Sequence, residues 1–311
     1  MENPVRNIWI LGGTGFIGEA LVKYLAADKS NRLHLVLHKK AYYRQFEGMN
    51  TFSSSLAGID PFWLERYPPD VLFHLARPAG SNILTRTLRS REGEKANRRL
   101  TGILAGLKKT PVTVYVSGSL VYGNRSSDNP ATEDSVPMPV SFARYYFRNE
   151  RPWIEAQREG ILDVRLARPG WIVGPASWFM MYFWLPYLRT GRVPCYGDGS
   201  QLMPVIHTRD CASMLDALAR FGSKGCNLNI FTGEVIRQRD FCNILSELLN
   251  AGTEYIPYDT ISRKYGKTTA EALTFSSSMK TLYPELYRKT DLGFRRVEDI
   301  LANVTGFLKN K

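Results

Sequence analysis

Cysteine is scarce in this chain, and its few copies follow no pattern. The four cysteines of the 311-residue sequence lie at positions 195, 211, 226 and 242, and none belongs to a CxxC pair. This spacing argues against a disulfide framework and against a zinc site, and it suits a reducing cytoplasm. Histidines and carboxylates also lack metal-ligand spacing, so the sequence predicts no bound metal.

Targeting and membrane-spanning segments are missing as well. Residues 1–7 are too short and too polar for a signal peptide, so we expect a cytoplasmic protein. The longest uncharged run, residues 169–188, has the length of a membrane span, but Pro175 and Pro186 would break a spanning helix. Three interpretations of its many aromatic residues stay open: buried core, the wall of a pocket for an apolar substrate, or a patch at a membrane surface.

Acidic side chains are outnumbered. The sequence has 29 Asp and Glu against 41 Lys and Arg, which gives a net charge of +12. The basic residues concentrate in the segments 86–99 and 144–158, which suits either a polyanionic partner or solvated helix faces. Because the chain lacks the usual nucleic-acid-binding motifs, we expect solvated faces and no nucleic-acid partner.

Short apolar runs alternate with amphipathic ones through the first half of the chain. The runs NIWILGG, RLHLVLH, DVLFHLA and VTVYVSG are typical of strands, and FIGEALVKYLA and RLTGILAGLKK have helical spacing. This order predicts an α/β protein, a Rossmann-type doubly wound parallel sheet with a small C-terminal α/β substrate lobe. We expect residues 1–174 to form the nucleotide-binding domain, with strands returning near 226–232. Residues 175–311 should form a smaller lobe that does not fold independently.

The strongest motif is a glycine-rich turn near the N-terminus. In IWILGGTGFIGEALVKYL, Gly12, Gly15 and Gly18 lie between an apolar strand and an amphipathic helix. The first glycine permits a tight turn, the second lets backbone N–H groups approach a pyrophosphate, and the third lets the helix pack closely on the sheet. We therefore predict a dinucleotide site here. The other residues of the turn that we expect at the cofactor are Thr14, Phe16 and Ile17.

The second strand ends without a carboxylate. An Asp or Glu at that point would hydrogen-bond the ribose 2′-hydroxyl of NAD. The strand RLHLVL is followed instead by His38, Lys39 and Lys40, and two ammonium groups suit a 2′-phosphate. We therefore predict NADP(H) in preference to NAD(H); the alternative is that both lysines are merely solvated.

Several motifs together resemble the extended short-chain dehydrogenase/reductase superfamily, and within it the NAD-dependent epimerase/dehydratase family. They are GGTGFIG (12–18), DVLFHLA (70–76), VSGSLVYG (116–123), LARPGWIVGP (166–175) and TDLGFRRVEDIL (290–301). The resemblance covers nearly the whole chain. It implies a small-molecule substrate, a nicotinamide cofactor and, as is common in that family, a homodimer. The further cofactor contacts that we expect at these motifs are Leu75, Ala76, Arg77, Ser117, Pro169 and Trp171.

The catalytic residues of that superfamily do not recur here. Its members use a Ser or Thr, a Tyr that exchanges a proton with the substrate oxygen, and a Lys four residues after the Tyr that lowers its pKa. The Ser/Thr position falls on Gly118, with Ser119 beside it as the remaining candidate. Alignment of the segment VSFARYYFRNERPWIEA (140–156) on its last glutamate places Phe147 at the Tyr position and Arg151 at the Lys position.

Shifting that alignment does not recover the missing Tyr–Lys pair. The residue four positions after Tyr145 is an asparagine, and the residue four positions after Tyr146 is a glutamate. Three interpretations stay open. In the first, the site is rebuilt, with Tyr145 or Tyr146 donating the proton and Arg151 supplying a fixed charge. In the second, the protein catalyses a reaction that needs no Tyr–Lys pair. In the third, the protein catalyses no reaction.

We expect an NADP(H)-dependent oxidoreductase acting on a small, apolar or aromatic carbonyl or hydroxyl compound. One alternative is a catalytically silent NADP-binding regulatory or interaction protein. Another is an epimerase, isomerase or dehydratase acting on a nucleotide-linked or natural-product substrate.

Overall fold

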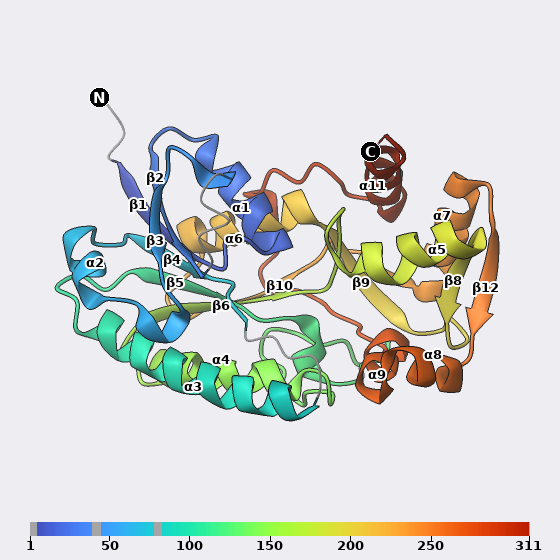
Figure 1. Ribbon diagram of the computed structural model, residues 1–311, viewed down its shortest axis with the longest axis horizontal. Coiled ribbons are helices and arrows are strands. Elements are labelled where there is room, and N and C mark those ends of the chain that lie inside the picture. Colours follow the sequence, from blue (N-terminus) through green and yellow to red (C-terminus); the bar gives the residue numbers. More distant parts are fainter. Residues whose placement is uncertain (1–4, 39–44, 78–82, 311) are drawn as a thin grey trace.

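A parallel sheet forms the larger part of the molecule (Figure 1). The structure is a computed structural model that describes residues 5–38, 45–77 and 83–310, and within these ranges the sheet has seven strands. In spatial order they are β10 (Asn227–Ile230), β6 (Asp163–Pro169), β5 (Val112–Val116), β4 (Val71–His74), β1 (Arg6–Leu11), β2 (Asn31–Leu37) and β3 (Asn50–Ser53). The chain winds outward from β1 in both directions, which confirms the predicted doubly wound Rossmann-type fold.

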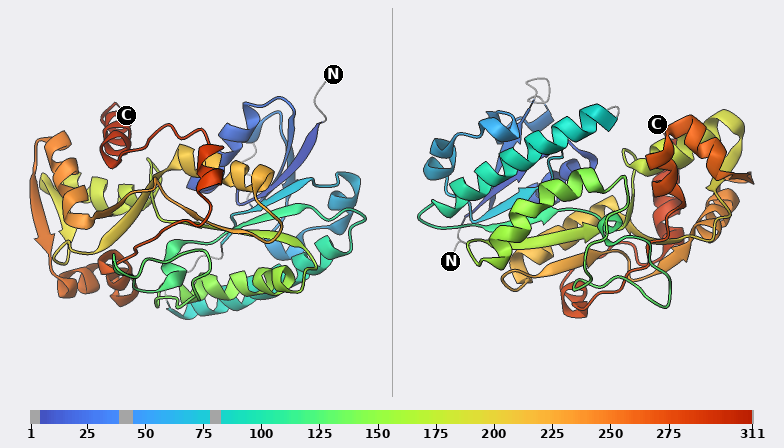
Figure 2. Two further views of the ribbon diagram at one scale, coloured as in Figure 1. Left: turned by 180° about the vertical axis from the view of Figure 1, so that it is seen from behind. Right: turned by 90° about the horizontal axis from the view of Figure 1, so that it is seen from below.

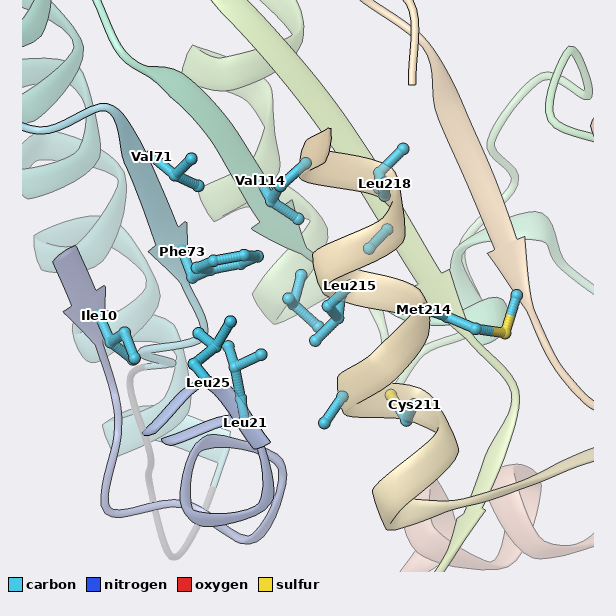
Figure 3. Close-up of a cluster of buried hydrophobic side chains, with 14 of the residues drawn as sticks. Ile10, Leu21, Leu25, Val71, Phe73, Val114, Cys211, Met214, Leu215 and Leu218 are labelled. Atoms are coloured by element: carbon cyan, nitrogen blue, oxygen red, sulfur yellow. The ribbon is translucent and has the colours of Figure 1, made fainter. Parts of the chain in front are cut away.

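Helices cover both faces of this sheet (Figures 1 and 2). One face carries α1 (Phe16–Ala26) and α6 (Thr208–Phe221); the other carries α2 (Pro61–Arg66), α3 (Ile83–Ala105) and α4 (Arg144–Arg158). Figure 3 shows Phe73 and Val114 of the sheet facing Leu215 of α6 across the first of these layers. Because the central strands are buried on both faces, β1, β4 and β5 are largely apolar in sequence.

The helix α3 is longer than the sequence predicted. Apolar spacing indicated a helix over 99–109, whereas α3 begins at Ile83 and ends at Ala105. Its last turns bury Leu100 and Leu104 against the sheet, and its exposed side carries most of the basic residues of the 86–99 segment. Those residues form an exposed helix surface, as expected from the charge pattern.

The second lobe is built from segments that leave the sheet after β6 and again after β10 (Figure 2). The sheet β11-β9-β7 and the parallel pair β12-β8 form its strands, and short helices surround them. The elements are β7 (Trp171–Val173), the π-helical segment η4 (Met180–Trp184), α5 (Leu185–Thr190), β8 (Arg192–Tyr196), β9 (Leu202–His207), β11 (Val235–Arg237), α7 (Gln238–Leu249), β12 (Gly252–Ile256), α8 (Tyr258–Tyr265), α9 (Lys267–Thr274) and α11 (Val297–Lys309). The helix α10 (Pro284–Arg288) packs on α6, and two 3-10 turns are η2 (Leu56–Gly58) and η3 (Ser119–Tyr122).

The aromatic run of residues 169–188 supplies much of the core of this lobe. Phe179 and Phe183 are buried to 1% exposure and pack against Tyr196 and Phe241. The run therefore folds into separate elements around its prolines. In the part of the chain that the structure describes, no helix has the length and apolar character needed to cross a membrane.

Candidate functional site

A cavity of about 950 Å³ lies where the parallel strands end, between the sheet and the second lobe. Its walls come from the segments that follow β1, β2, β3, β4 and β5, from the end of β6, and from β7. Ligands of open parallel α/β sheets bind at this edge. The structure brings together here every predicted cofactor residue that it describes: Gly12, Thr14, Gly15, Phe16, Ile17, Gly18, His38, Leu75, Ala76, Arg77, Ser117, Pro169 and Trp171. Lys39 and Lys40 lie outside the described residues.

The three glycines of the N-terminal turn are required for different reasons. Gly12 has a φ of +87°, and a Cβ there would lie 2.6 Å from the backbone N of Ala76. A Cβ on Gly18 would lie 2.2 Å from the carbonyl oxygen of Gly12, so α1 can pack this closely only with glycine. Gly15 differs, because its nearest neighbour would be 3.5 Å away, an ordinary contact. Packing does not demand Gly15, which leaves open space beside the first N–H groups of α1.

This geometry fits a dinucleotide. The first turn of α1 has free backbone N–H groups and the positive end of the helix dipole, and both favour a phosphate. The end of β2 has no carboxylate: Leu37 is followed by His38, which lines the cavity. Ser54 and Ser55, after β3, line the same end and add hydroxyl groups that sequence reasoning missed. Loop serines carry no distinguishing sequence signal, so only the folded chain places them here.

The catalytic candidates differ in whether they line the cavity. Tyr146 lines the cavity, and a Cβ on Gly118 would lie 3.7 Å from its hydroxyl oxygen. Ser119 also lines the cavity, from the first position of η3. Tyr145 is not among the lining residues, and its backbone carbonyl accepts hydrogen bonds from the side chains of Ser90 and Asn149.

The alignment that placed Phe147 and Arg151 at the Tyr and Lys positions does not match this arrangement. Phe147 packs beside the buried cluster of Val121 and Tyr122, and Arg151 is exposed on α4. Neither lines the cavity. The residue one helical turn after Tyr146 is Glu150, which is fully buried. A carboxylate therefore lies where a Tyr–Lys pair would have its ammonium group.

Glu150 is the centre of a buried polar network. Its Oε1 accepts a hydrogen bond of 2.8 Å from Arg168 of β6, and its Oε2 accepts one of 2.5 Å from the hydroxyl of Ser117. The Arg168 guanidinium lies 4.6 Å from the centre of the Tyr122 ring. The hydroxyl of Tyr122 in turn donates to Asn229 at 2.7 Å. This network connects α4 to β6 and to the residue that follows β5.

The surroundings keep Tyr146 protonated at neutral pH. Burial raises the pKa of its phenol, the Arg77 guanidinium opposes this rise, and the Glu150 carboxylate raises the pKa further. Burial dominates, so the pKa of Tyr146 is above its usual range. A phenol in this state donates a hydrogen bond or a proton.

Aromatic side chains form part of the wall of the cavity that Tyr146 also lines. Trp171 and Trp178 meet edge to face at 5.7 Å, and Phe142 meets Trp178 at 5.1 Å. All three line the cavity, together with Leu120 and Ile172. We call these five residues, three aromatic and two aliphatic, the aromatic chamber. Trp178 and Phe142 were not predicted as site residues, although a pocket wall is one of the three interpretations left open for the aromatic run that contains Trp178.

Two further polar residues near the site have structural partners. His74 is fully buried and hydrogen-bonds through Nε2 to Asn97 at 2.7 Å, and burial lowers its pKa to about 4. Tyr122 is 1% exposed, and burial raises its pKa to about 12. Among the residues that the structure describes, no group of three or more histidine, cysteine or carboxylate side chains could hold a metal ion.

The parallel sheet, the glycine turn and the cavity at the strand ends define a Rossmann-type protein with a dinucleotide-shaped site. Residues 8–230 match the model of the NAD dependent epimerase/dehydratase family, so the chain belongs to that family.

Solved structures with this fold share little sequence with the chain. The dTDP-glucose 4,6-dehydratase DesIV from Streptomyces venezuelae, determined with NAD, is 20% identical with a TM-score of 0.77, covering 98% of this chain and 97% of its own. The UDP-glucuronic acid 4-epimerase from Bacillus cereus, determined with NAD, is 17% identical with a TM-score of 0.79, covering 98% and 99%. The human epimerase family protein SDR39U1, determined with NADPH, is 18% identical with a TM-score of 0.76, covering 96% and 99%.

A curated relative is the uncharacterized protein y4nG of Sinorhizobium fredii (strain NBRC 101917 / NGR234). It is 23% identical over an alignment of 276 residues that covers 80% of this chain. The chain spans 62% of the length of that relative.

Proposed function

We propose that this protein is an NADP(H)-dependent oxidoreductase that reduces a small, apolar or aromatic carbonyl compound, with Tyr146 as the proton donor. The observation that carries the proposal is the position of the Tyr146 hydroxyl. It lies beside Gly118, in the one cavity that both the glycine turn and the aromatic chamber line. A carbonyl group held there would meet a protonated phenol on one side and apolar walls around it.

The groups that would hold the cofactor have been described. The first N–H groups of α1 would receive its pyrophosphate, and His38, Ser54 and Ser55 would lie at its 2′-phosphate end. When bound, NADPH would supply the hydride. The absence of a carboxylate at the end of β2 favours NADP(H) over NAD(H), since a carboxylate there would repel the 2′-phosphate.

The chain's own residues provide the proton and the orientation. Tyr146 is protonated at neutral pH because burial raises its pKa, so it is suited to donate to a developing alkoxide. Gly118 has no side chain, so a substrate oxygen held beside it would meet both the Tyr146 hydroxyl and Nη2 of Arg77, each of which lies 3.7 Å from the position of a Cβ there. The aromatic chamber excludes water and favours a flat, apolar substrate over a sugar.

A second candidate is an NADP-binding protein without turnover. It is favoured by Glu150, whose buried carboxylate follows Tyr146 by one helical turn and makes ionisation of the phenol harder. Such a protein would bind NADPH but would not oxidise it, whichever carbonyl compound was added.

The first experiment is a calorimetric titration with NADPH and NADH. We expect NADPH to bind at least tenfold more tightly, and equal affinities would remove the assignment of NADP(H). Aromatic and aliphatic aldehydes and ketones are then screened for NADPH oxidation. With an active substrate, Tyr146→Phe should lower turnover by about 10² or more while NADPH affinity stays the same. The matched control is Tyr145→Phe, which removes the neighbouring hydroxyl outside the cavity and should change turnover less than a few-fold.

A further inference from the structure

The guanidinium of Arg77 covers the ring of Tyr146. Arg77 follows β4, and its guanidinium carbon lies 4.6 Å from the centre of the phenol ring. Its Nη2 donates to the backbone carbonyl of Ser117, and it lies 3.4 Å from the carbonyl of Val116. The side chain thus reaches from the end of β4 to the end of β5, directly over the catalytic phenol.

Other ionisable groups face Tyr146 from each element packed against it. Glu150 lies on α4, Arg168 on β6 and the neutral phenol of Tyr115 on β5. Glu150 and Arg168 neutralise each other through their 2.8 Å hydrogen bond, and both are buried, with exposures of 0% and 3%. Their charges therefore act on Tyr146 in opposite directions.

Arg77 is a cation beside Tyr146 that takes no part in the pairing of Glu150 with Arg168. Within residues 5–38, 45–77 and 83–310, no carboxylate forms an ion pair with it, and its side chain is exposed to the open cavity. A guanidinium stays charged throughout the accessible pH range, and its flat face suits stacking on a ring. Arg77 can therefore orient the phenol and stabilise negative charge on its oxygen at the same time.

We propose that Arg77 is the positioning residue of Tyr146: it holds the phenol against Gly118 and supplies the positive charge that stabilises the phenolate formed when the proton leaves. This inference deepens the proposed function and rests on it for its chemical meaning. It also gives Glu150 a structural role, because the charge that assists Tyr146 comes from the loop after β4 and not from α4.

The coupling can be measured without a substrate or a cofactor. A ring-fluorinated tyrosine, whose phenol ionises at lower pH than tyrosine itself, is introduced at position 146 and titrated by fluorine NMR. In this background Arg77→Gln should raise the pKa of the phenol by about 1 unit, the low end of the range for a cation at this distance, because Arg77 is exposed. Arg77→Lys keeps the charge but loses the flat face, and it should raise the pKa by less.

The matched control is Arg89→Gln. Arg89 is another arginine of the cavity wall, but it pairs with Glu92 at 3.0 Å and does not stack on Tyr146. Its replacement should shift the pKa at position 146 by less than a third of the Arg77→Gln shift. An equal shift in both variants, or none in either, would overturn the proposal. If Arg77→Gln does not fold, Arg77→Met, which keeps much of the side-chain length without the charge, decides: an unchanged pKa overturns the proposal.

The two proposals fail separately. If NADPH does not bind the unmodified protein but the pKa at position 146 rises in Arg77→Gln, the proposed function is lost and the coupling of the two side chains is supported. If NADPH binds and the pKa does not move, the oxidoreductase proposal stands and the role of Arg77 is refuted.

Discussion

The buried ion pair between Glu150 and Arg168 should be among the most sensitive points of the fold. Both side chains are almost inaccessible, and within the described residues Arg168 forms an ion pair with this carboxylate alone, at 2.8 Å. Glu150→Gln keeps the shape of the side chain but leaves a guanidinium buried without a counter-charge. Breaking such a pair from one side costs about 3–5 kcal/mol. Arg168→Gln should cost a similar amount, because it leaves the carboxylate unpaired.

Urea unfolding followed by tryptophan fluorescence measures this cost. With a slope of about 3 kcal/mol per M, the expected loss moves the midpoint down by roughly 1–2 M. The double variant Glu150→Gln, Arg168→Gln should cost less than the sum of the single variants, since it leaves no buried charge. The control is Glu155→Gln on the same helix, which breaks the exposed pair with Arg98 and should cost under about 1 kcal/mol. Equal midpoint shifts for Glu150→Gln and Glu155→Gln would refute the reasoning.

Three further predictions address the cavity and the core. Gly15→Ala should fold almost normally but bind NADPH at least tenfold more weakly, because its methyl group meets only the carbonyl of Gly12 at 3.5 Å and points into the cofactor space; unchanged affinity in calorimetry would contradict this. Trp178→Phe should remove a large part of the fluorescence quenching by NADPH, and quenching equal to that of the parent protein would place the cofactor elsewhere. The folded-state pKa of His74 is about 4, below the 6.5 of the unfolded chain, so its contribution to stability is complete above pH 6.5 and is lost as the pH falls toward 4. His74→Gln should flatten this part of the stability–pH curve, and an unchanged slope would show that His74 is not its source.

The strands could be predicted from sequence because burial on both faces leaves a strong signal. All the apolar runs of the first half are strands of the sheet, and the glycine turn lies where the pattern placed it. The start of α3 gave no such signal. Residues 86–99 are rich in arginine and have few apolar positions, and the helix is held by Leu100 and Leu104 further along and by contact with α4.

The helix α4 shows the limit more sharply. Successive helical residues are about 100° apart, so an alignment error of one position turns a side chain from the cavity to another face. Alignment on Glu155 favoured Phe147, whereas Tyr146 is the residue whose hydroxyl lies beside Gly118. The partner of Glu150 could not be foreseen either, because Glu150 lies on α4 and Arg168 lies on β6. The role of Arg77 depends on the same kind of contact, between segments almost 70 positions apart in the sequence.

The position of β10 has a consequence for synthesis on the ribosome. This strand closes the sheet beside β6, yet the chain makes 57 residues between Pro169 and Asn227 before it arrives. Until then the emerging protein presents the unpaired edge of β6, a strand that is buried in the folded protein, to its surroundings. The aromatic run 169–188 is synthesised in the same interval, and its partner Phe241 comes later still. The nascent chain should therefore depend most on chaperones just after its nucleotide-binding half has been translated.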